Sequence, residues 1–312
     1  MLAPPAISSL GFIGLGVMGA PMCSNLAAHS GLPVAGFDAV PEAMARVARA
    51  AFTASASIAE VAAHADLVFL SLPAVAQVSD VCRGPGGLFA AAQGGGPKRR
   101  MKMLVDMSTS AVKETRELAA EAEQHGIVYL DAPVARLREA ARLGTLSIMV
   151  GGPQEAYQTV LPYLRCMGSD ITHCGGVGAG QTVKILNNMI VFMTAHALSE
   201  ALLIGRAAGV DPKLLFETMA LGSADSFVLR NQGLKALVPG HFPLQAFPTE
   251  YAIKDIRLAL ELARDGGVVA SQAARTHALL EKTRDAGYAK EYYPVMFKLL
   301  EAMIEAPPGR GA

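Results

Sequence analysis

A lysine and an asparagine four residues apart, Lys184 and Asn188, are the strongest candidates for catalysis in this sequence. On a helix the two side chains share one face, and the segment from Ile185 to Ile190 is largely apolar. Burial of a lysine disfavours its charged form and lowers its pKa toward neutrality. Such a lysine can exchange a proton with a hydroxyl group, so we predict general acid/base chemistry. The alternative is a lysine at a helix start whose ammonium group extends to solvent.

A glycine-rich motif, GLGVMG, follows an apolar run of strand length near the start of the chain. In a turn from strand to helix, the first glycine permits the tight bend and the second lets a pyrophosphate approach the backbone. The third lets the helix pack closely on the strand. The phosphates would then sit at the helix N-terminus. The predicted dinucleotide-binding residues are Gly14, Leu15, Gly16, Val17, Met18 and Gly19.

An aspartate, Asp38, ends the next run of strand length, PVAGFD. Its offset from the motif is close to the ~20 residues at which an acidic residue holds the adenosine ribose. The carboxylate would accept hydrogen bonds from both ribose hydroxyls and repel a 2′-phosphate, so NAD is the preferred cofactor and NADP the alternative. An aspartate that simply ends a strand is the competing interpretation.

The composition limits the partners of the protein. The 312 residues include 27 basic and 27 acidic side chains and are 52% hydrophobic, so no charge excess would attract nucleic acid or an anionic membrane. The four cysteines lie far apart without metal-ligand spacing, so no metal is expected. With no positively charged leader at its start, the chain is predicted to be a cytoplasmic enzyme.

Apolar runs of strand length alternate with Ala-rich segments over the first half of the chain, which predicts βαβ units and a mostly parallel sheet. From Ala179 to Ala208 the sequence indicates one long apolar helix, closed by Gly209, with Asp211 and Pro212 opening the next. We predict an α/β Rossmann domain at 1–176 and an all-α domain at 177–312. The helical domain would bind substrate and assemble a homodimer or homotetramer. Residues 93–102, rich in glycine and basic side chains, are predicted to be a surface loop.

Seven motifs occur in an order that resembles the β-hydroxyacid dehydrogenase family. They are GFIGLGVMGAPMCSNL at 11–26, LP at 72–73, DMST at 106–109, DAPV at 131–134, GTLSIMVGG at 144–152, GGVGAGQTVKILNN at 175–188 and KD at 254–255. The family includes 3-hydroxyisobutyrate dehydrogenase and tartronate semialdehyde reductase, and 6-phosphogluconate dehydrogenase is a distant relative. The resemblance covers nearly the whole chain.

The resemblance implies the reversible NAD(P)-dependent oxidation of a small 3-hydroxy acid to its semialdehyde. It makes Lys184 the general acid/base and Asn188 a residue that orients the substrate. The cofactor contacts that it implies are Leu72, Pro73, Thr109, Phe247 and Lys254, and the substrate contacts are Ala135, Arg136, Asn187 and Lys254.

The chain departs from the family pattern directly after DAPV. Family members usually have Ser-Gly-Gly there and bind the substrate carboxylate with it, whereas this chain has Ala135, Arg136 and Leu137. A guanidinium suits bidentate contact with an anion, so we predict that Arg136 binds an atypical acidic substrate such as a sulfonate or dicarboxylate. Sulfolactaldehyde reductase, of the same family, is similar in having an arginine in this loop. The alternative is an Arg136 that faces solvent or pairs with Glu139.

Two other classes of function fit the same architecture. One is an imine reductase-like enzyme, in which the lysine position commonly holds an acidic or aromatic residue, and the other is a non-catalytic dehydrogenase-fold binding module that has lost the lysine. The presence of Lys184 argues against both.

Overall fold

The computed structural model describes residues 6–47, 51–93, 101–244 and 246–304. The chain folds into two compact units, residues 1–184 and 185–312, so that the long helix α9 contributes to both. The boundary predicted from the sequence, 176/177, lies in the loop before this helix. Residues 94–100 of the loop predicted at 93–102 are outside the described part.

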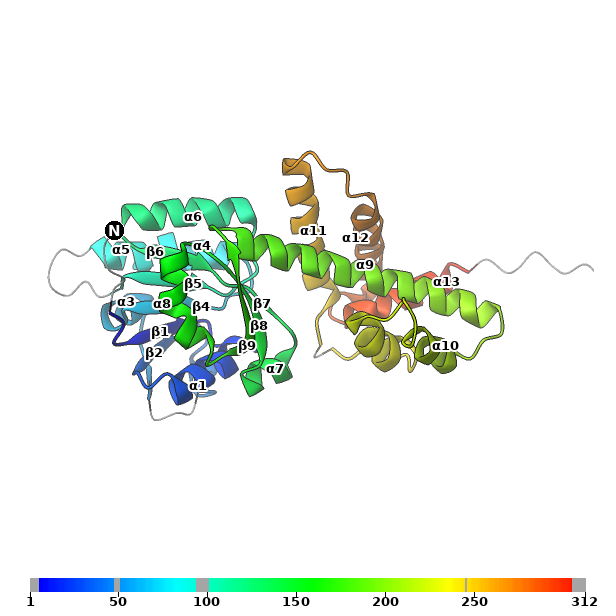
Figure 1. Cartoon of the computed structure of the whole chain (residues 1–312), viewed down its shortest axis with the longest axis horizontal. Coiled ribbons are helices and arrows are strands. Elements are labelled where there is room, and N and C mark those ends of the chain that lie inside the picture. Colours follow the sequence, from blue (N-terminus) through cyan, green and yellow to red (C-terminus); the bar gives the residue numbers. More distant parts are fainter. Residues whose placement is uncertain (1–5, 48–50, 94–100, 245, 305–312) are drawn as a thin grey trace, which may run out of the picture. The chain divides into compact units, whose positions relative to one another are not determined.

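The first unit is built on one nine-stranded sheet (Figure 1). Its strands are β1 (Leu10–Ile13), β2 (Val34–Phe37), β3 (Phe52–Ala54), β4 (Leu67–Leu70), β5 (Met103–Asp106), β6 (Val128–Asp131), β7 (Val134–Ala135), β8 (Leu146–Gly151) and β9 (Gly168–Gly175). The order is β3-β2-β1-β4-β5-β6-β8-β7, with β9 paired to β8. Strands β1 to β6 run parallel, which confirms the predicted Rossmann architecture.

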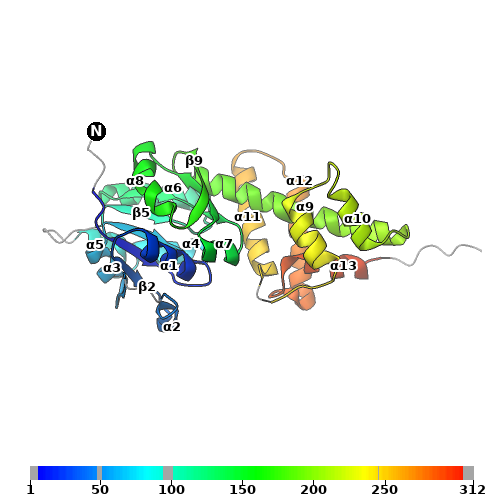
Figure 2. The ribbon, with the colours of Figure 1, turned by 60° about the horizontal axis from the view of Figure 1, so that its bottom comes forward.

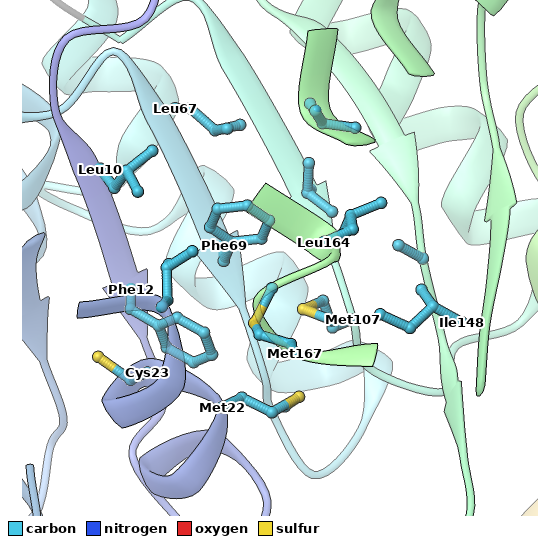
Figure 3. Packing of buried hydrophobic residues seen from close by; sticks show 14 of the residues in the cluster. Leu10, Phe12, Met22, Cys23, Leu67, Phe69, Met107, Ile148, Leu164 and Met167 are labelled. Carbon is cyan, nitrogen blue, oxygen red and sulfur yellow. The ribbon is translucent and has the colours of Figure 1, made fainter. Parts of the chain in front are cut away.

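Helices cover both faces of this sheet, and Figure 1 shows α1 and α6 on opposite sides. The helices are α1 (Gly19–His29), α2 (Pro41–Met44), α3 (Ile58–His64), α4 (Val75–Arg83), α5 (Leu88–Gln93), α6 (Val112–Gln124), α7 (Arg138–Leu143) and α8 (Gln154–Leu164). One core cluster joins α1 and α8 to the sheet, where Met22 and Cys23 lie beside Phe12 (Figure 3). A second core cluster joins the four helices from α3 through α6 to the opposite face of the sheet. Burial of both strand faces explains why these strands were recognisable as continuous apolar runs.

The edge formed by β7, β8 and β9 carries the loop that follows DAPV. Strand β7 is antiparallel to β8, and β9 is parallel to β8. Helix α7 lies beside α1 (Figure 2), where Asn25 Nδ2 of α1 donates a 2.8 Å hydrogen bond to the Ala141 carbonyl of α7. The segment between β7 and β8, residues 136–145, is called the α7 loop. Its helix is therefore held against α1 of the first unit.

The described residues of the second unit are helical apart from loops and one isolated β-bridge, as predicted. The elements are α9 (Ala179–Ala207), α10 (Pro212–Met219), the π-helix η1 (Leu229–Leu237), α11 (Thr249–Asp265), α12 (Ser271–Thr283), η2 (Arg284–Tyr288), the 3₁₀ turn η3 (Tyr293–Val295) and α13 (Met296–Ala302). Their common core includes Phe192 and Leu202 of α9, Phe216 of α10 and Ile256 of α11. The core forms where the apolar faces of these helices meet.

The ends of α9 and α10 follow the predicted signals. Gly209 has a positive φ of 81° after α9, and the Asp211 side chain accepts a 2.9 Å hydrogen bond from the Leu214 backbone N–H at the start of α10. By length and composition, α9 could cross a membrane. Because Phe192, Leu198 and Leu202 of this helix lie in the core of the helical unit, packing accounts for part of its apolar character.

Candidate active site

The turn between β1 and α1 has the geometry of a dinucleotide-binding loop. Gly14 has a φ of 92°, and a Cβ on Gly19 would collide with the carbonyl oxygen of Gly14. A Cβ on Gly16 would meet nothing within 4 Å. The first and third glycines are therefore required by the fold, whereas the space over Gly16 allows a ligand to approach the backbone.

Asp38 lies against this turn. It follows β2, which is paired with β1, and its Oδ2 atom accepts a 2.6 Å hydrogen bond from the Leu15 backbone N–H. The Val40 N–H donates to the other carboxylate oxygen at 2.8 Å. The structure thus brings Asp38 and the glycine-rich loop together at the carboxyl ends of two parallel strands, where open α/β sheets bind their ligands.

The next two strand ends carry further predicted cofactor residues. Leu72 and Pro73 follow β4, Thr109 follows β5, and these strands are paired so that Leu70 lies opposite Asp106. The Leu72 backbone N–H donates a 2.9 Å hydrogen bond to Ser108 Oγ. The two loops are thereby joined, and the predicted cofactor residues of the first unit follow four strands that are neighbours in the sheet.

A fully buried carboxylate, Asp106, organises the loop after β5. It accepts hydrogen bonds from the Ser108 backbone N–H at 2.9 Å, from Tyr129 Oη at 3.1 Å and from Ser110 Oγ at 3.4 Å. Burial raises the pKa of Asp106, and these hydrogen bonds act in the opposite direction. Asp106 therefore stabilises the conformation of the loop after β5 and is itself inaccessible from the surface.

A second buried carboxylate, Asp131, caps the N-terminus of α9. Its oxygens accept hydrogen bonds from the backbone N–H groups of Gly178 at 2.7 Å and Gln181 at 2.8 Å. A Cβ on Gly151 would collide with the Asp131 carboxylate, and a Cβ on Gly180 would stand 2.8 Å from Asp131 Oδ2. Burial raises the pKa of Asp131, and the backbone hydrogen bonds lower it. The cap fixes where the helix that carries Lys184 begins.

Gln181 fastens the same helix to the loop after β5. Its side chain is fully buried, with Nε2 donating to the Ser108 carbonyl at 2.8 Å and Oε1 accepting from the Ser110 backbone N–H at 3.0 Å. Lys184 follows three residues later, one helical turn along α9, and is only 9% exposed. A continuous path of hydrogen bonds therefore runs from Leu72 through Ser108 to the helical turn of Lys184.

In the helical unit, Asn188 belongs to a polar cluster in which Asn188 and Asp255 are buried. Its Nδ2 atom donates a 2.7 Å hydrogen bond to Asp255 Oδ2 of α11, and its Oδ1 atom accepts a 3.1 Å hydrogen bond from Asn187. The Lys254 ammonium lies 3.1 Å from Asp255 Oδ1. The structure thus brings together three predicted residues, Asn187, Asn188 and Lys254, around an aspartate to which no role was assigned from the sequence.

Phe247, also a predicted cofactor contact, lies in an aromatic cluster of the helical unit. Its ring centroid is 6.0 Å from those of Phe192 and Tyr251 and 6.2 Å from that of Tyr293. The ring of Phe192 meets that of Tyr293 edge-on at 5.0 Å. Phe247 is therefore positioned by aromatic packing at the start of α11.

Arg136 makes contacts that were not expected from the sequence. Its Nη1 atom donates to the Thr145 carbonyl at 2.6 Å and to Ser169 Oγ at 3.1 Å, and its Nη2 atom lies 2.7 Å from Asp170 Oδ2. Glu139 instead pairs with Arg142. The guanidinium is thus engaged with neighbours in its own unit, and direct contact with a substrate stays a prediction.

Three positioning residues, Asp131, Gln181 and Asp255, had no role in the sequence-based prediction. Each lies inside a motif that carries the family resemblance, but a motif gives no partner for a polar side chain. The signal in the sequence was a polar residue inside an otherwise apolar segment, which must find a hydrogen bond when buried.

Comparison with known proteins identifies the family. Residues 9–176 match the NAD binding domain of 6-phosphogluconate dehydrogenase, and residues 178–300 match the family described as NAD-binding of NADP-dependent 3-hydroxyisobutyrate dehydrogenase. The chain is 35% identical to 2-(hydroxymethyl)glutarate dehydrogenase of Eubacterium barkeri over 94% of this chain and 95% of that one. It is 34% identical to 2-hydroxy-3-oxopropionate reductase of Escherichia coli over 94% and 97%.

A solved structure supports the same assignment. The 3-hydroxyisobutyrate dehydrogenase of Mycobacterium tuberculosis with L-serine has a TM-score of 0.83 and 29% identity, covering 95% of this chain and 99% of that one. The family expected from the motif order is confirmed, and so is the succession of a Rossmann domain and a helical domain. The chain belongs to the β-hydroxyacid dehydrogenase family and is an NAD(P)-dependent oxidoreductase.

Proposed function

We propose that the protein interconverts a small anionic 3-hydroxy acid and its semialdehyde, with Lys184 as the general acid/base. The observation that carries this proposal is the placement of Lys184, which is buried one turn after a helix start that Asp131 caps and Gln181 fastens to the loop after β5. A lysine held in this way by buried hydrogen bonds has a defined position, as proton transfer to a substrate oxygen requires.

The loops of the first unit fit a nicotinamide dinucleotide. The open space over Gly16 accommodates the pyrophosphate, Asp38 would accept the ribose hydroxyls, and the predicted residues Leu15, Val17, Met18, Leu72, Pro73 and Thr109 complete the contacts. Phe247 and Lys254 are proposed as contacts from the helical unit. When bound, the dinucleotide supplies the hydride acceptor or donor of the reaction. No metal is needed for this chemistry.

The proton chemistry is assigned to the residues of α9. In oxidation, neutral Lys184 takes the proton of the substrate hydroxyl, and in reduction its ammonium form returns a proton to the same oxygen. Asn188 is proposed to orient the substrate through its amide, which the hydrogen bond to Asp255 holds in one orientation. The roles of the two residues differ, since Lys184 exchanges the proton and Asn188 does not.

The acidic end of the substrate is assigned to the turn of Ala135 and Arg136, with Asn187 and Lys254 as further contacts. A relative named for 2-(hydroxymethyl)glutarate acts on a dicarboxylate, which supports a substrate with a second anionic group. A sulfonate is the other candidate, because the backbone N–H groups of this turn suit its oxygens.

NAD is proposed as the preferred cofactor because Asp38 would repel a 2′-phosphate. Replacement of Asp38 by Ser should raise the KM for NAD by about tenfold and narrow its advantage over NADP, as expected for a lost pair of charge-assisted hydrogen bonds. Steady-state kinetics with both cofactors measures this, with Asp80→Ser, an aspartate on α4, as the control. A wild-type preference for NADP would contradict the assignment.

We further propose a cytoplasmic homodimer or homotetramer that interacts with neither nucleic acid nor membranes. Exposed apolar side chains on α9, Val183, Leu186, Ile190 and Ile204, favour contact between subunits through this helix. Light scattering of the purified protein measures the assembly state.

The decisive experiment is a substrate panel. We expect NAD-linked turnover of at least one of 3-hydroxyisobutyrate, glycerate, 2-(hydroxymethyl)glutarate and a hydroxysulfonate, and loss of that turnover in Lys184→Ala. The matched control is Lys213→Ala, because Lys213 is an exposed lysine on α10. A wild-type enzyme inactive on every hydroxy acid and semialdehyde tested would contradict the proposal.

A further inference from the structure

The turn after β7 holds an arginine in a backbone conformation that favours glycine. Among the described residues, Arg136 is the one non-glycine residue with a positive φ, at 82°. A side chain in this region brings Cβ close to the backbone. The conformation therefore costs energy and persists only where other contacts maintain it. The guanidinium of Arg136 makes contacts that can maintain this conformation.

The guanidinium contacts two segments that lie apart in the sequence. Thr145, whose carbonyl it contacts at 2.6 Å, comes directly after Gly144 and the end of α7. This one hydrogen bond therefore connects the two ends of the α7 loop. Ser169 and Asp170, contacted at 3.1 and 2.7 Å, belong to β9. Arg136 thus fastens both ends of the loop to the outer strand of the sheet.

An irregularity in β9 places the two acceptors opposite Arg136. Leu146 of β8 pairs with Gly168, whereas the next residue, Ser147, pairs with Asp170, so Ser169 is an extra residue in the ladder. Ala135 pairs with the same Ser147 from the other side. The row of Ala135, Ser147 and Asp170 crosses three strands, and a β-bulge at Ser169 is the kind of feature that re-aims side chains.

We propose that Arg136 is a positioning residue that holds the turn at 135–137 in its left-handed conformation, with Thr145, Ser169 and Asp170 as the anchor. This inference rests on the proposed function, in which that turn receives the acidic end of the substrate. The arginine then acts on substrate affinity by fixing the backbone of the turn, and its guanidinium stays on the anchor.

Glycine and alanine at position 136 separate this role from direct anion binding. Both variants lose the guanidinium and with it the anchor. Glycine adopts a positive φ without strain, whereas alanine keeps the Cβ that makes this conformation costly. Arg136→Ala should therefore raise the substrate KM by about fivefold, and Arg136→Gly should raise it clearly less. Asp170→Asn should also raise KM, while kcat changes little in each variant. Arg142→Ala is the control, because Arg142 is an exposed arginine on the same loop.

Direct anion binding gives a different pattern. Arg136→Ala and Arg136→Gly would raise KM equally, and Asp170→Asn would leave KM unchanged or lower it by releasing the guanidinium. Either result overturns the inference, as does an unchanged KM in all three variants.

Hydrogen exchange provides a test that needs no turnover. Peptides covering residues 134–147 and 168–175 should lose more protection in Arg136→Ala than in Arg136→Gly, and Arg142→Ala should match the wild type. Equal loss in the alanine and glycine variants, or none, overturns the inference. If the wild type is inactive on the whole substrate panel, the proposed function fails, and the exchange data alone decide on the role of Arg136.

Discussion

The two units of the molecule hold their polar site residues in different ways. In the sheet unit, Asp38, Asp131 and Gln181 each bond to backbone groups, which belong to the turn after β1, the start of α9 and the loop after β5, respectively. In the helical unit, Asn188 and Asp255 bond to each other through their side chains, 67 residues apart in the sequence. Backbone groups are present whatever the side chain is, whereas a side-chain pair depends on the identity of both partners.

This difference has an energetic consequence. A backbone group that loses its side-chain partner in the sheet unit lies in a turn, a loop or a first helical turn, where a small shift of the backbone can bring another partner within reach. A substitution in the helical cluster leaves a carboxylate or amide buried without its partner, which carries the full desolvation cost. Substitutions at Asp255 and Gln181 compare the two kinds of site. Lys184 lies on α9, the helix that both units share.

The largest effect is expected for Lys184→Ala. Loss of a general acid/base should lower kcat by about 10² to 10⁴, with the Kd for NAD little changed. Stopped-flow single-turnover kinetics, together with cofactor titration, measures both. Turnover near the wild-type level would exclude Lys184 as the proton-transfer group.

Asp255→Asn should be the next most severe. The substitution keeps the shape but removes the charge that faces Lys254 and replaces one of the two acceptor oxygens by an NH2 group. Asn188 and Lys254 then compete for the single oxygen that is left, so the free energy of unfolding should fall by about 1 to 3 kcal/mol. Urea denaturation measures this, and kcat/KM should fall along with it. Glu261→Gln on the same helix is the control, since Glu261 is partly exposed and pairs with Arg257 in an i,i+4 ion pair.

A double-mutant cycle shows whether the Asp255 effect comes from the contact with Asn188. Combined with Asn188→Ala, the loss in Asp255→Asn should become smaller, because the two side chains are hydrogen-bonded. Strict additivity would mean that the effect arises elsewhere.

Gln181→Leu should have a smaller effect on stability than Asp255→Asn. It leaves the Ser108 carbonyl and the Ser110 N–H without their partner, and adjustment of the loop after β5 should limit the cost to about 1 kcal/mol. Because the turn before Lys184 loosens, kcat should fall more than the KM for NAD rises. The exposed Gln154→Leu of α8 is the control. A stability loss larger than that of Asp255→Asn would reverse the comparison of the two units.

The smallest effect concerns the exposed ion pair of Asp170. The Ser169 hydroxyl and the Arg136 guanidinium lower the pKa of Asp170 below its ordinary value of 3.8. A lowered pKa gives a stabilisation that is present above pH 3.8 and lost as the pH falls through the lowered pKa. The difference in Tm between wild type and Asp170→Asn should therefore vanish in acid and shrink in high salt. A difference that grows as the pH falls would contradict this.

The fold was largely predictable from the sequence, because its main strands are buried on both faces and appear as apolar runs. The apolar runs of strand length in the first half of the chain correspond to β1, β2, β4, β5, β6 and β8. The strands that were not recognised are short, as β3 and β7 are, or largely polar and partly exposed, as β9 is. Such strands depend on their neighbours in the sheet more than on their own composition.

The site was predictable where the requirement is local. The glycines of the first turn are dictated by their own backbone, so their spacing reveals them. The positions of Gln181 and Asp255 are dictated by groups far away in the sequence, and no periodicity predicts those partners. Arg136 shows the same limit, since its residue type suggested an anion ligand and the neighbouring β9 supplies its contacts.

The cap on α9 has a consequence for how the family can evolve. Asp131 occupies space that a Cβ at Gly151 or Gly180 would enter, so three positions separated by 20 to 49 residues share one volume. A longer acid at 131 or a side chain at Gly151 would have to be matched by a change at the other position, whereas a side chain at Gly180 would also meet the Met149 backbone carbonyl. Positions 131 and 151 should therefore diverge together, and position 180 should stay glycine in any relative that keeps this backbone.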